Sequence, residues 1–200
     1  MAANGIFCLE TQWGAKLTDR SSVELQLRML ENLGVAGGVI HRDVATVEEF
    51  EHYLKTWLQK HYARFSVGYL ALHGSRGRIR AGSTDLSLDD LAQVIDGRGD
   101  GRTLYLGSCS TLAAPEAELL DFCASTKVRA LVGYTRQIEW RESAALDVIL
   151  LPELLRSADL KRLHARLKKD HPRFVDGLGL RIATAQWATG RTPAVHATGS

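Results

Sequence analysis

Residues 66–74 read SVGYLALHG, and residues 103–110 read TLYLGSCS. Each stretch is a short apolar run, which is typical of a buried strand, and each run stops at small and polar residues. Between them, Ser87 and Asp90 have the spacing of a helix start, and the helix continues to Ile95. Two strands joined by a helix are the unit from which parallel sheets are built, so this part of the chain predicts two parallel strands.

The same alternation of apolar runs and helical patterns continues on both sides of this unit. Further strand-like runs cover residues 5–11, 35–41, 128–135 and 179–185, and helical patterns cover residues 21–33, 46–58, 115–125, 141–156 and 159–171. Ser21 and Glu24 have the spacing of a capping box. Residues 77–82 indicate an exposed turn or short hairpin. We therefore predict an α/β fold with a mainly parallel sheet of about six strands and helices on both faces.

Length and composition are those of a single soluble domain. The chain has 200 residues, of which 45% are hydrophobic and 24% charged, so it can bury a sizeable core. We expect one domain over residues 1–186 and a flexible tail over residues 187–200. No signal peptide or membrane span is predicted, and the three cysteines lack the spacing of a zinc site. These features predict a protein of the reducing cytoplasm.

The balance of charge argues against partners that a strong overall field would attract. Lys and Arg number 25 and Asp and Glu number 23, which leaves a net charge of +2. We therefore expect neither a nucleic-acid partner nor a membrane partner. His41, His52 and His61 have no spacing typical of metal ligands, so we also expect no metal.

His73 and Cys109 follow the two central apolar runs. In a parallel α/β sheet the carboxyl ends of neighbouring strands meet at one edge, where reactive groups gather. A free thiol is mostly protonated at neutral pH, so a nucleophilic Cys109 needs a basic neighbour, which His73 supplies. The small residues around both side chains predict that the backbone amides of Gly74 and Cys109 stabilise the oxyanion of an attacked carbonyl group.

These segments resemble the clan CD cysteine peptidases, which include caspases, metacaspases and separase, and they are most similar to bacterial CHAT domains. The resemblance is carried by a strand ending in His-Gly, a strand followed by Gly-Ser-Cys-Ser-Thr, the crossover helix and the next strand, which are here Tyr69–Gly74, Leu106–Thr111, Leu86–Leu91 and Val128–Gly133. It covers residues 5–155 in element order. Unlike animal caspases, the chain has no Gln and Arg flanking the cysteine, so a preference for aspartate is not implied.

The resemblance implies a caspase-like three-layer sandwich and a cysteine endopeptidase that cleaves a protein or peptide. Cys109 would attack the scissile carbonyl and form a thioester, His73 would transfer protons, and neither a metal nor an organic cofactor would be needed. The resemblance also suggests a regulated protease of bacterial defence or cell death. An activating protein partner, self-association as a homodimer or a loop rearrangement would then switch it on.

The resemblance also places residues that would select the substrate. The loop that contains Glu139, Trp140 and Glu142 falls where related enzymes build part of the S1 pocket, and Trp140 would form a wall. Glu139 or Glu142 would pair with a basic P1 residue, whereas Arg20, in the loop after the first strand, would favour an acidic one. We favour a basic P1 residue bound by Glu139.

Two other functions are compatible with the same residues. The first is a non-catalytic module that keeps the fold and binds a partner through its strand edges or its basic C-terminal helix. The second is a cysteine amidase that acts on small molecules. We expect Cys8 and Cys123 to be buried core residues. A reactive Cys109 that depends on His73 would distinguish an enzyme from a binding module.

Overall fold

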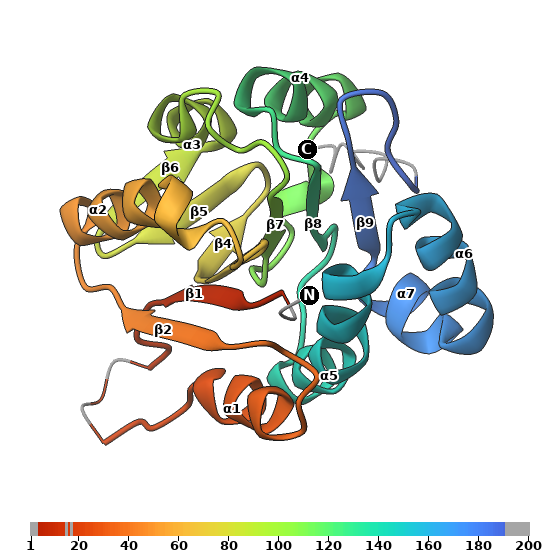
Figure 1. The fold of residues 1–200 in the computed structure, drawn as a ribbon, viewed down its shortest axis with the longest axis horizontal. Helices are drawn as coiled ribbons and strands as arrows, with labels where there is room; N and C mark the ends of the chain where they lie inside the picture. Colours follow the sequence, from red (N-terminus) through yellow and green to blue (C-terminus); the bar gives the residue numbers. More distant parts are fainter. Residues whose placement is uncertain (1–3, 15, 17, 191–200) are drawn as a thin grey trace, which may run out of the picture.

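A six-stranded sheet forms the centre of the fold (Figure 1). The computed structural model describes residues 4–14, 16 and 18–190. The strands are β1 (Ile6–Glu10), β2 (Val39–Asp43), β3 (Val67–Ala71), β7 (Thr103–Leu106), β8 (Ala130–Tyr134) and β9 (Leu180–Ala183), in the spatial order β2-β1-β3-β7-β8-β9. The first five are parallel, and β9 is antiparallel to β8. The predicted α/β class and mainly parallel sheet are therefore confirmed.

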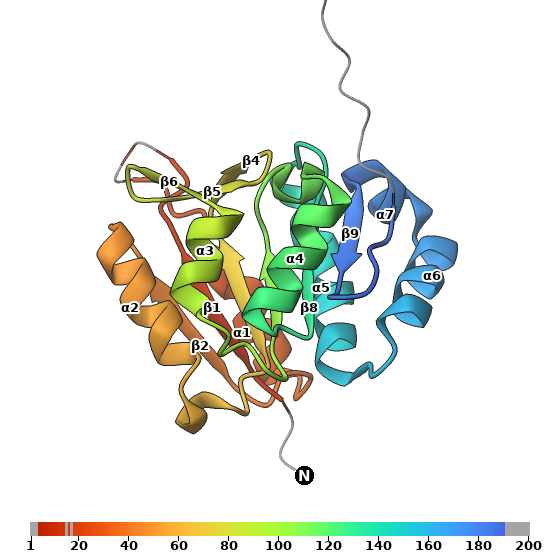
Figure 2. The same cartoon turned by 90° about the horizontal axis from the view of Figure 1, so that it is seen from above.

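Helices cover both faces of this sheet (Figure 2). One face is covered by α2 (Val47–Trp57), α3 (Leu88–Ile95) and α4 (Glu116–Thr126). The other is covered by α1 (Glu24–Asn32), α5 (Trp140–Arg156), α6 (Leu160–Asp170) and α7 (Pro172–Leu178). Two short 3-10 helices are η1 (Lys60–Tyr62) and η2 (Thr111–Ala113). The described chain thus has three layers, and α7 is the helix that the sequence patterns do not predict.

The sheet separates two hydrophobic cores, because side chains alternate between the faces of each strand. On β1, Leu9 points into the core under α2, α3 and α4, and Cys8 points into the core under α1 and α5. Close packing requires a glycine on β3, since a Cβ on Gly68 would lie 2.4 Å from the ring of the fully buried Trp57. Trp57 Nε1 donates to the Phe65 carbonyl oxygen at 2.7 Å, so the polar atom of this ring is satisfied.

A small antiparallel sheet follows β3 where the sequence predicts a turn or short hairpin. It consists of β4 (His73–Ser75), β5 (Arg78–Ala81) and β6 (Thr84–Ser87). Residues alternate as expected for a strand that is covered on one face, so Arg78 and Arg80 are exposed while Ile79 is buried. The sheet leads into α3, where Ser87 and Asp90 form the predicted capping box.

The start of α1 differs from the prediction. Ser21 does not form a capping box with Glu24, because its hydroxyl donates to Asp19 Oδ1 at 2.8 Å. Instead, the buried carboxylate of Glu10, at the end of β1, accepts from the Val23 N–H at 2.8 Å. A carboxylate in this place also interacts favourably with the helix dipole. A residue from another element therefore stabilises the start of this helix.

The chain stays folded beyond the predicted end of the domain. The Thr184 N–H donates to the Trp187 carbonyl oxygen at 2.8 Å, and Arg181 Nε donates to the Thr189 carbonyl oxygen at 3.1 Å. Residues 187–189 therefore pack against β9, because hydrogen bonds to β9 and to its following turn hold them. Residues 191–200 of the predicted tail lie outside the described residues. Among the described helices, none combines the length and the apolar character needed to cross a membrane.

Candidate active site

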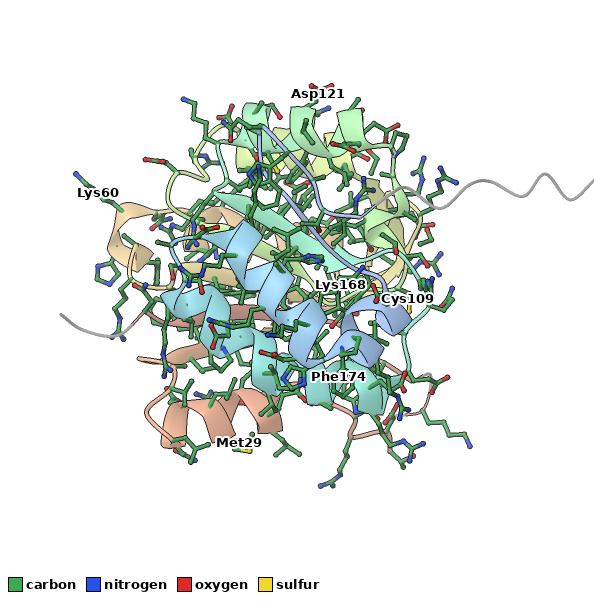
Figure 3. All side chains as sticks on the ribbon, turned by 90° about the vertical axis from the view of Figure 1, so that its right-hand side faces the viewer. Met29, Lys60, Cys109, Asp121, Lys168 and Phe174 are labelled. Atoms are coloured by element: carbon green, nitrogen blue, oxygen red, sulfur yellow. The ribbon has the colours of Figure 1, made fainter. Side chains whose placement is uncertain are left out.

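His73 and Cys109 lie at the same edge of the main sheet. β3 and β7 are adjacent and parallel, so their carboxyl ends meet there. The chain leaves β3 into β4, which begins at His73, and it leaves β7 through Gly107 to reach Cys109. Both side chains line one pocket of about 280 Å³, which we call the Cys109 pocket. Figure 3 shows Cys109 at the opposite end of the molecule from Lys60, which precedes β3.

The backbone of β4 packs directly against the Cys109 loop. A Cβ on Gly74 would lie 2.6 Å from Ser108 Cβ and from Thr111 Oγ1, and 3.0 Å from the Cys109 carbonyl oxygen. A glycine is the residue that fits this contact without displacing the loop. The Gly77 N–H also donates to the Thr111 carbonyl oxygen at 3.1 Å. The two segments are therefore held together, and the backbones of Gly74 and Cys109 both border the pocket.

Cys109 is the partly exposed thiol among the three free cysteines of the chain. Cys8 and Cys123 are buried, as predicted, and burial raises the pKa of both thiols, that of Cys123 to about 12. Such thiols are not nucleophiles at neutral pH, because the reactive form is the thiolate. Next to Cys109, Ser110 has a left-handed φ of 55°, and its N–H donates to the Arg136 carbonyl oxygen at 2.9 Å. Strained backbone of this kind is common at functional sites.

Trp13 holds the imidazole of His73. His73 Nε2 lies 3.2 Å from the Trp13 carbonyl oxygen, and because a carbonyl oxygen only accepts, Nε2 carries the proton of this hydrogen bond. In the neutral ring, Nδ1 is then the basic atom. The Trp13 indole meets the imidazole edge to face, with ring centroids 5.2 Å apart and planes at 72°. Trp13 therefore determines both the tautomer and the orientation of the ring.

The walls of the Cys109 pocket are largely apolar. Trp140, the first residue of α5, lines the pocket, and its ring packs edge to face on Trp13 with centroids 5.0 Å apart. Val23, Leu72 and Ile138 line it as well. The sequence patterns do not single out Trp13, although a tryptophan shortly after the first apolar run is a signal for a pocket wall.

Glu139 and Glu142 lie outside the Cys109 pocket. They line a separate surface pocket, where Glu142 forms an ion pair with Arg173 at 2.8 Å. The reason is helical geometry, because successive residues of a helix point about 100° apart. Trp140 and Ser143 share the face of α5 that borders the Cys109 pocket, and the two carboxylates do not. Among the predicted substrate-binding side chains, Trp140 is therefore the one that lies beside Cys109.

A larger cavity of about 730 Å³ adjoins the Cys109 pocket, and His73 lines both. It lies at the carboxyl ends of β1 and β2, and Arg20 is exposed within it. We call it the acidic cavity, since its lining contains five carboxylates, which belong to Glu10, Asp19, Glu24, Asp43 and Glu49. The structure thus places Arg20 among acidic residues, where it does not create a positively charged site.

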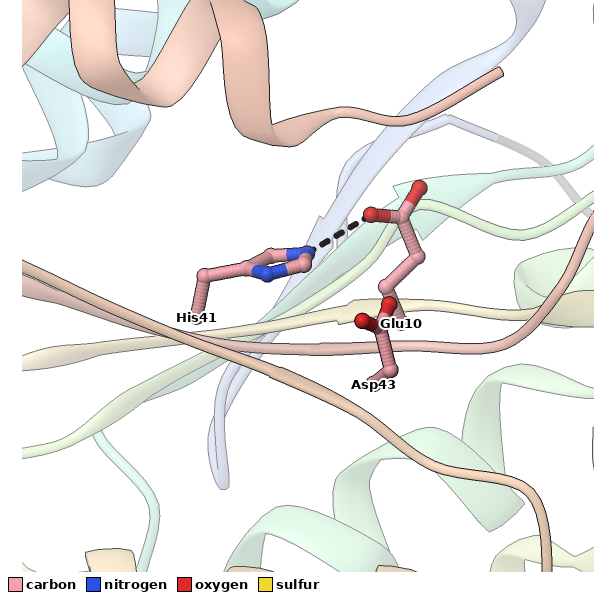
Figure 4. A group of neighbouring side chains, drawn as sticks. All are labelled: Glu10, His41 and Asp43. Carbon is pink, nitrogen blue, oxygen red and sulfur yellow. Dashed lines mark hydrogen bonds and ion pairs between the residues drawn. The ribbon is translucent and has the colours of Figure 1, made fainter. Parts of the chain in front are cut away.

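Three residues of the acidic cavity form a cluster that the spacing of histidines along the sequence does not predict. Glu10, His41 and Asp43 each place one potential metal-ligand atom within 4.8 Å of the others (Figure 4). Glu10 and Asp43 stand opposite each other in the ladder of β1 and β2, and His41 lies two residues before Asp43 on the same face. His41 Nε2 and Glu10 Oε2 are 2.7 Å apart in a hydrogen bond, which a divalent cation would have to replace. The sequence signal for this cluster is that polar residues end two successive apolar runs.

The Glu10 and His41 side chains form a buried ion pair. Burial by itself would raise the pKa of Glu10, but hydrogen bonds from His41, Trp13, Ser22 and Val23 outweigh burial and lower the pKa. Burial would likewise lower the pKa of His41, but the hydrogen bond and the negative charge of Glu10 raise it. Both shifts favour the charged forms. A fixed pair of opposite charges therefore lies in the same cavity as His73.

A second buried carboxylate lies beneath the Cys109 pocket. Asp147 on α5 accepts hydrogen bonds from Tyr69 OH at 2.6 Å, Tyr105 OH at 2.5 Å and Gln26 Nε2 at 2.7 Å. Tyr69 lines the pocket, and a Cβ on Gly107 would lie 2.2 Å from its ring. Burial raises the pKa of Asp147 to about 6, although these hydrogen bonds act in the opposite direction. The network connects α5 to β3 and β7 below the pocket.

Comparison with known proteins gives a family and a number of similar solved structures, among them two caspase structures. No curated protein matches the chain. A structure of pro-Sf-caspase-1 is 11% identical with a TM-score of 0.41, and a structure of caspase-1 from Spodoptera frugiperda is 12% identical with a TM-score of 0.40. Each covers 54% of this chain, which spans about half the length of those proteins, 46% and 48%. The model of a family of unknown function, DUF6642, matches residues 3–183, and the chain belongs to that family.

Proposed function

We propose that this protein is a cysteine endopeptidase in which Cys109 is the nucleophile and His73 is the general acid and base. The observation that carries the proposal is the pocket that both side chains line. Acyl transfer needs a thiol, an oriented imidazole and backbone N–H groups near the reacting carbonyl, and residues of these types border this pocket. The resemblance of the segments around His73 and Cys109 to clan CD peptidases implies the same chemistry.

The reaction proceeds in two stages through a thioester. Nδ1 of His73 accepts the proton of Cys109, and the thiolate attacks the carbonyl carbon of the scissile bond to form a C–S bond. The backbone amides of Gly74 and Cys109 stabilise the negative charge on the carbonyl oxygen. The C–N bond breaks as His73 protonates the leaving amine. A water molecule, deprotonated by His73, then hydrolyses the thioester and restores the thiol.

The two adjoining cavities favour a polypeptide substrate over a small amide. Because His73 lines both, a chain bound at Cys109 extends from the apolar pocket into the acidic cavity. The apolar pocket suits an apolar side chain, and the acidic cavity suits a basic one. We therefore retain a basic residue next to the scissile bond as the preference, and we assign its recognition to Asp43 in place of Glu139.

A peptide library that varies the residues on both sides of the scissile bond tests this preference. Asp43→Asn is expected to lower kcat/KM for basic peptides by about tenfold, which corresponds to the loss of one hydrogen bond to a charged group. Glu139→Ala is the matched control, since Glu139 lines a different pocket, and it should leave the preference unchanged. The opposite pattern would return the assignment to Glu139.

Covalent labelling tests the nucleophile itself. A peptidyl electrophile is expected to attach to Cys109 in the folded protein, with the site identified by mass spectrometry of the digested product. Cys109→Ala should abolish labelling, and His73→Ala should slow it by about a hundredfold, as for loss of a general base. Cys8 and Cys123 serve as internal controls that become labelled on unfolding. Labelling of Cys109 at the wild-type rate in His73→Ala would contradict the proposed role of His73.

The same measurements separate the other candidate functions. An unreactive Cys109 in the folded protein would favour a non-catalytic binding module. Hydrolysis of small amides without cleavage of any library peptide would favour a cysteine amidase. The cytoplasmic location, the task in bacterial defence or cell death, and activation by a protein partner or by homodimer formation belong to the same proposal.

A further inference from the structure

Trp13 contacts the proposed general base from the loop after β1. His73 Nε2 faces the Trp13 carbonyl oxygen at 3.2 Å, and the two rings meet edge to face. Trp13 also packs on Trp140, which forms a wall of the Cys109 pocket. Trp13 itself lies between β1 and α1, outside any strand or helix, so no backbone ladder holds it. Its place therefore depends on a side-chain contact.

Glu10 supplies that contact. Its Oε1 accepts hydrogen bonds from Trp13 Nε1 and, at 2.8 Å, from the Val23 N–H. Its Oε2 accepts at 2.7 Å from Ser22 Oγ and from His41 Nε2. The Glu10 residue is only 2% exposed. One carboxylate thus joins the end of β1, the loop that contains Trp13, the start of α1 and β2.

The number of donors requires a carboxylate at this position. Each oxygen of Glu10 accepts two hydrogen bonds, and an ionised carboxylate has about four acceptor sites. A glutamine would keep the length of the side chain but would turn an NH₂ group toward two of the donors. The ion pair with His41 strengthens the network, because charge-assisted hydrogen bonds are about twice as strong as neutral ones. These protein donors also account for the short spacing of Glu10 and His41 without a cation.

We infer that Glu10 is a positioning residue of the proposed active site, which holds Trp13 so that Trp13 orients the imidazole of His73. The inference rests on the proposed function, because it assigns Glu10 a task in the same reaction. Glu10 transfers no proton in that reaction. Its effect reaches His73 through the backbone carbonyl and the indole ring of Trp13.

Glu10→Gln tests the inference with two readouts that need no peptidase activity. In protein labelled with ¹⁵N-tryptophan, the indole N–H signal of Trp13 is assigned with Trp13→Phe, and the histidine ring signals report the pH titration of His73. We expect the Trp13 signal to move upfield in Glu10→Gln, since its acceptor loses charge, and the His73 titration to shift. Glu49→Gln is the matched control, because it removes a carboxylate from the same cavity, and that carboxylate accepts from the Ala45 N–H at 2.8 Å and belongs to α2.

The third readout is the rate at which Cys109 reacts with the peptidyl electrophile. Glu10→Gln is expected to lower this rate by about tenfold or more, because a small misplacement of a catalytic group costs up to about a hundredfold. In peptide cleavage the loss should appear in kcat more than in KM, since the charge of Glu10 is paired with His41 and Asp43 is the carboxylate assigned to the basic side chain. Trp13→Phe keeps an aromatic ring and the carbonyl group but lacks the N–H, so its effect should have the same direction.

A wild-type His73 titration together with a wild-type labelling rate in Glu10→Gln would overturn the inference. If Glu10→Gln does not fold, Trp13→Phe decides, and an unchanged His73 titration in that variant would also overturn it. An unreactive Cys109 in the wild-type protein would contradict the proposed function only. In that case the Trp13 and His73 signals would still measure whether Glu10 positions the imidazole.

Discussion

Glu10 and Asp147 are two buried carboxylates on the side of the sheet that α1 and α5 cover, yet their surroundings have opposite effects. The residues are 2% and 1% exposed, but Asp147 lies deeper inside the molecule, so burial acts more strongly on its carboxylate. Glu10 accepts hydrogen bonds from the cationic ring of His41 and from a backbone N–H, whereas Asp147 accepts from two phenols and an amide. The pKa of Glu10 is lowered, and that of Asp147 is raised to about 6.

This difference shows that the depth of burial and the donors around a carboxylate together decide its ionisation state. A cation and N–H donors compensate for the removal of a carboxylate from water, while neutral hydroxyl groups compensate only in part. Glu10 therefore keeps a fixed charge in the cavity beside His73. Asp147 takes up a proton near pH 6, in the layer beneath Cys109. Each of the following substitutions tests this contrast.

Glu10→Leu should have the largest effect, because it leaves the His41 ring, whose pKa burial then lowers, and three further donors without their acceptor. We expect the free energy of unfolding at pH 7 to fall by about 3–5 kcal/mol, as for a broken buried ion pair. Urea denaturation measures the loss. Glu24→Leu removes a partly exposed carboxylate that pairs with Arg28 at 3.0 Å and lies 3.7 Å from His41 Nδ1, and it should cost less than about 1 kcal/mol. Equal losses in the two variants would show that the ion pair does not stabilise the fold.

Asp147→Asn should change how stability depends on pH. The pKa of Asp147 is about 6 in the folded protein against 3.8 for the free group, so between these values the folded state binds the extra proton. The contribution of Asp147 to the free energy of unfolding therefore falls as pH rises through this window, by about 3 kcal/mol in total. In Asp147→Asn the free energy of unfolding should not show this decrease with rising pH. Urea denaturation from pH 4 to pH 7 would contradict the prediction if the two stability curves ran parallel.

His41→Gln should lower the free energy of unfolding by a smaller amount, and this loss should depend on pH over a different range. Because Glu10 raises the pKa of His41, the stability from this pair is complete below the ordinary pKa of 6.5 and is lost as pH rises through the raised value. At pH 6 we expect a loss of about 2 kcal/mol, typical of a charged hydrogen bond, and a smaller loss at pH 9. His52→Gln, at an exposed position on α2, is the control. A loss that is independent of pH would contradict the ionic interpretation.

Glu142→Gln extends the comparison to a carboxylate at the surface. Its ion pair with Arg173 is solvent-exposed, so we expect the free energy of unfolding to change by less than about 1 kcal/mol and the change to vanish in high salt. A double-mutant cycle with Arg173→Gln measures the coupling. A coupling above 2 kcal/mol would make this surface pair as strong as the buried pair of Glu10 and His41. That result would contradict the view that an ion pair must be buried to contribute much to stability.

Much of the fold follows from local patterns in the sequence. The apolar runs that end at Leu72 and Leu106 predict buried strands, and Ser87 with Asp90 predicts the start of α3. The capping box at Ser21 is wrong because the carboxylate of Glu10 already serves the start of α1. Hydrogen bonds to β9 and to its following turn also hold residues 187–189, which follow the expected boundary at residue 186. In both cases a contact between separate elements replaces a local rule.

In the candidate site, too, local patterns predict some features, and contacts between separate elements decide the others. The expectation that His73 and Cys109 share one edge needs only the order of strands, because parallel neighbours end on the same side. Glu139 does not reach the pocket, because the start of α5 sets the direction of its side chain. That direction cannot be predicted from the sequence of a loop. Trp13 was missed because nothing in its neighbouring residues shows that its carbonyl group faces an imidazole sixty residues later.

The sequence by itself determines the α/β class, the succession of strands and helices, and the places of His73 and Cys109 after two strands, since these depend on apolar periodicity over short stretches. The tertiary structure alone decides that Glu10 holds Trp13, that Trp13 orients His73, and that Asp147 lies under the pocket among tyrosines. The physical reason is that the pKa and the orientation of a buried polar group depend on the donors and charges that surround it, and these come from elements far apart in the chain.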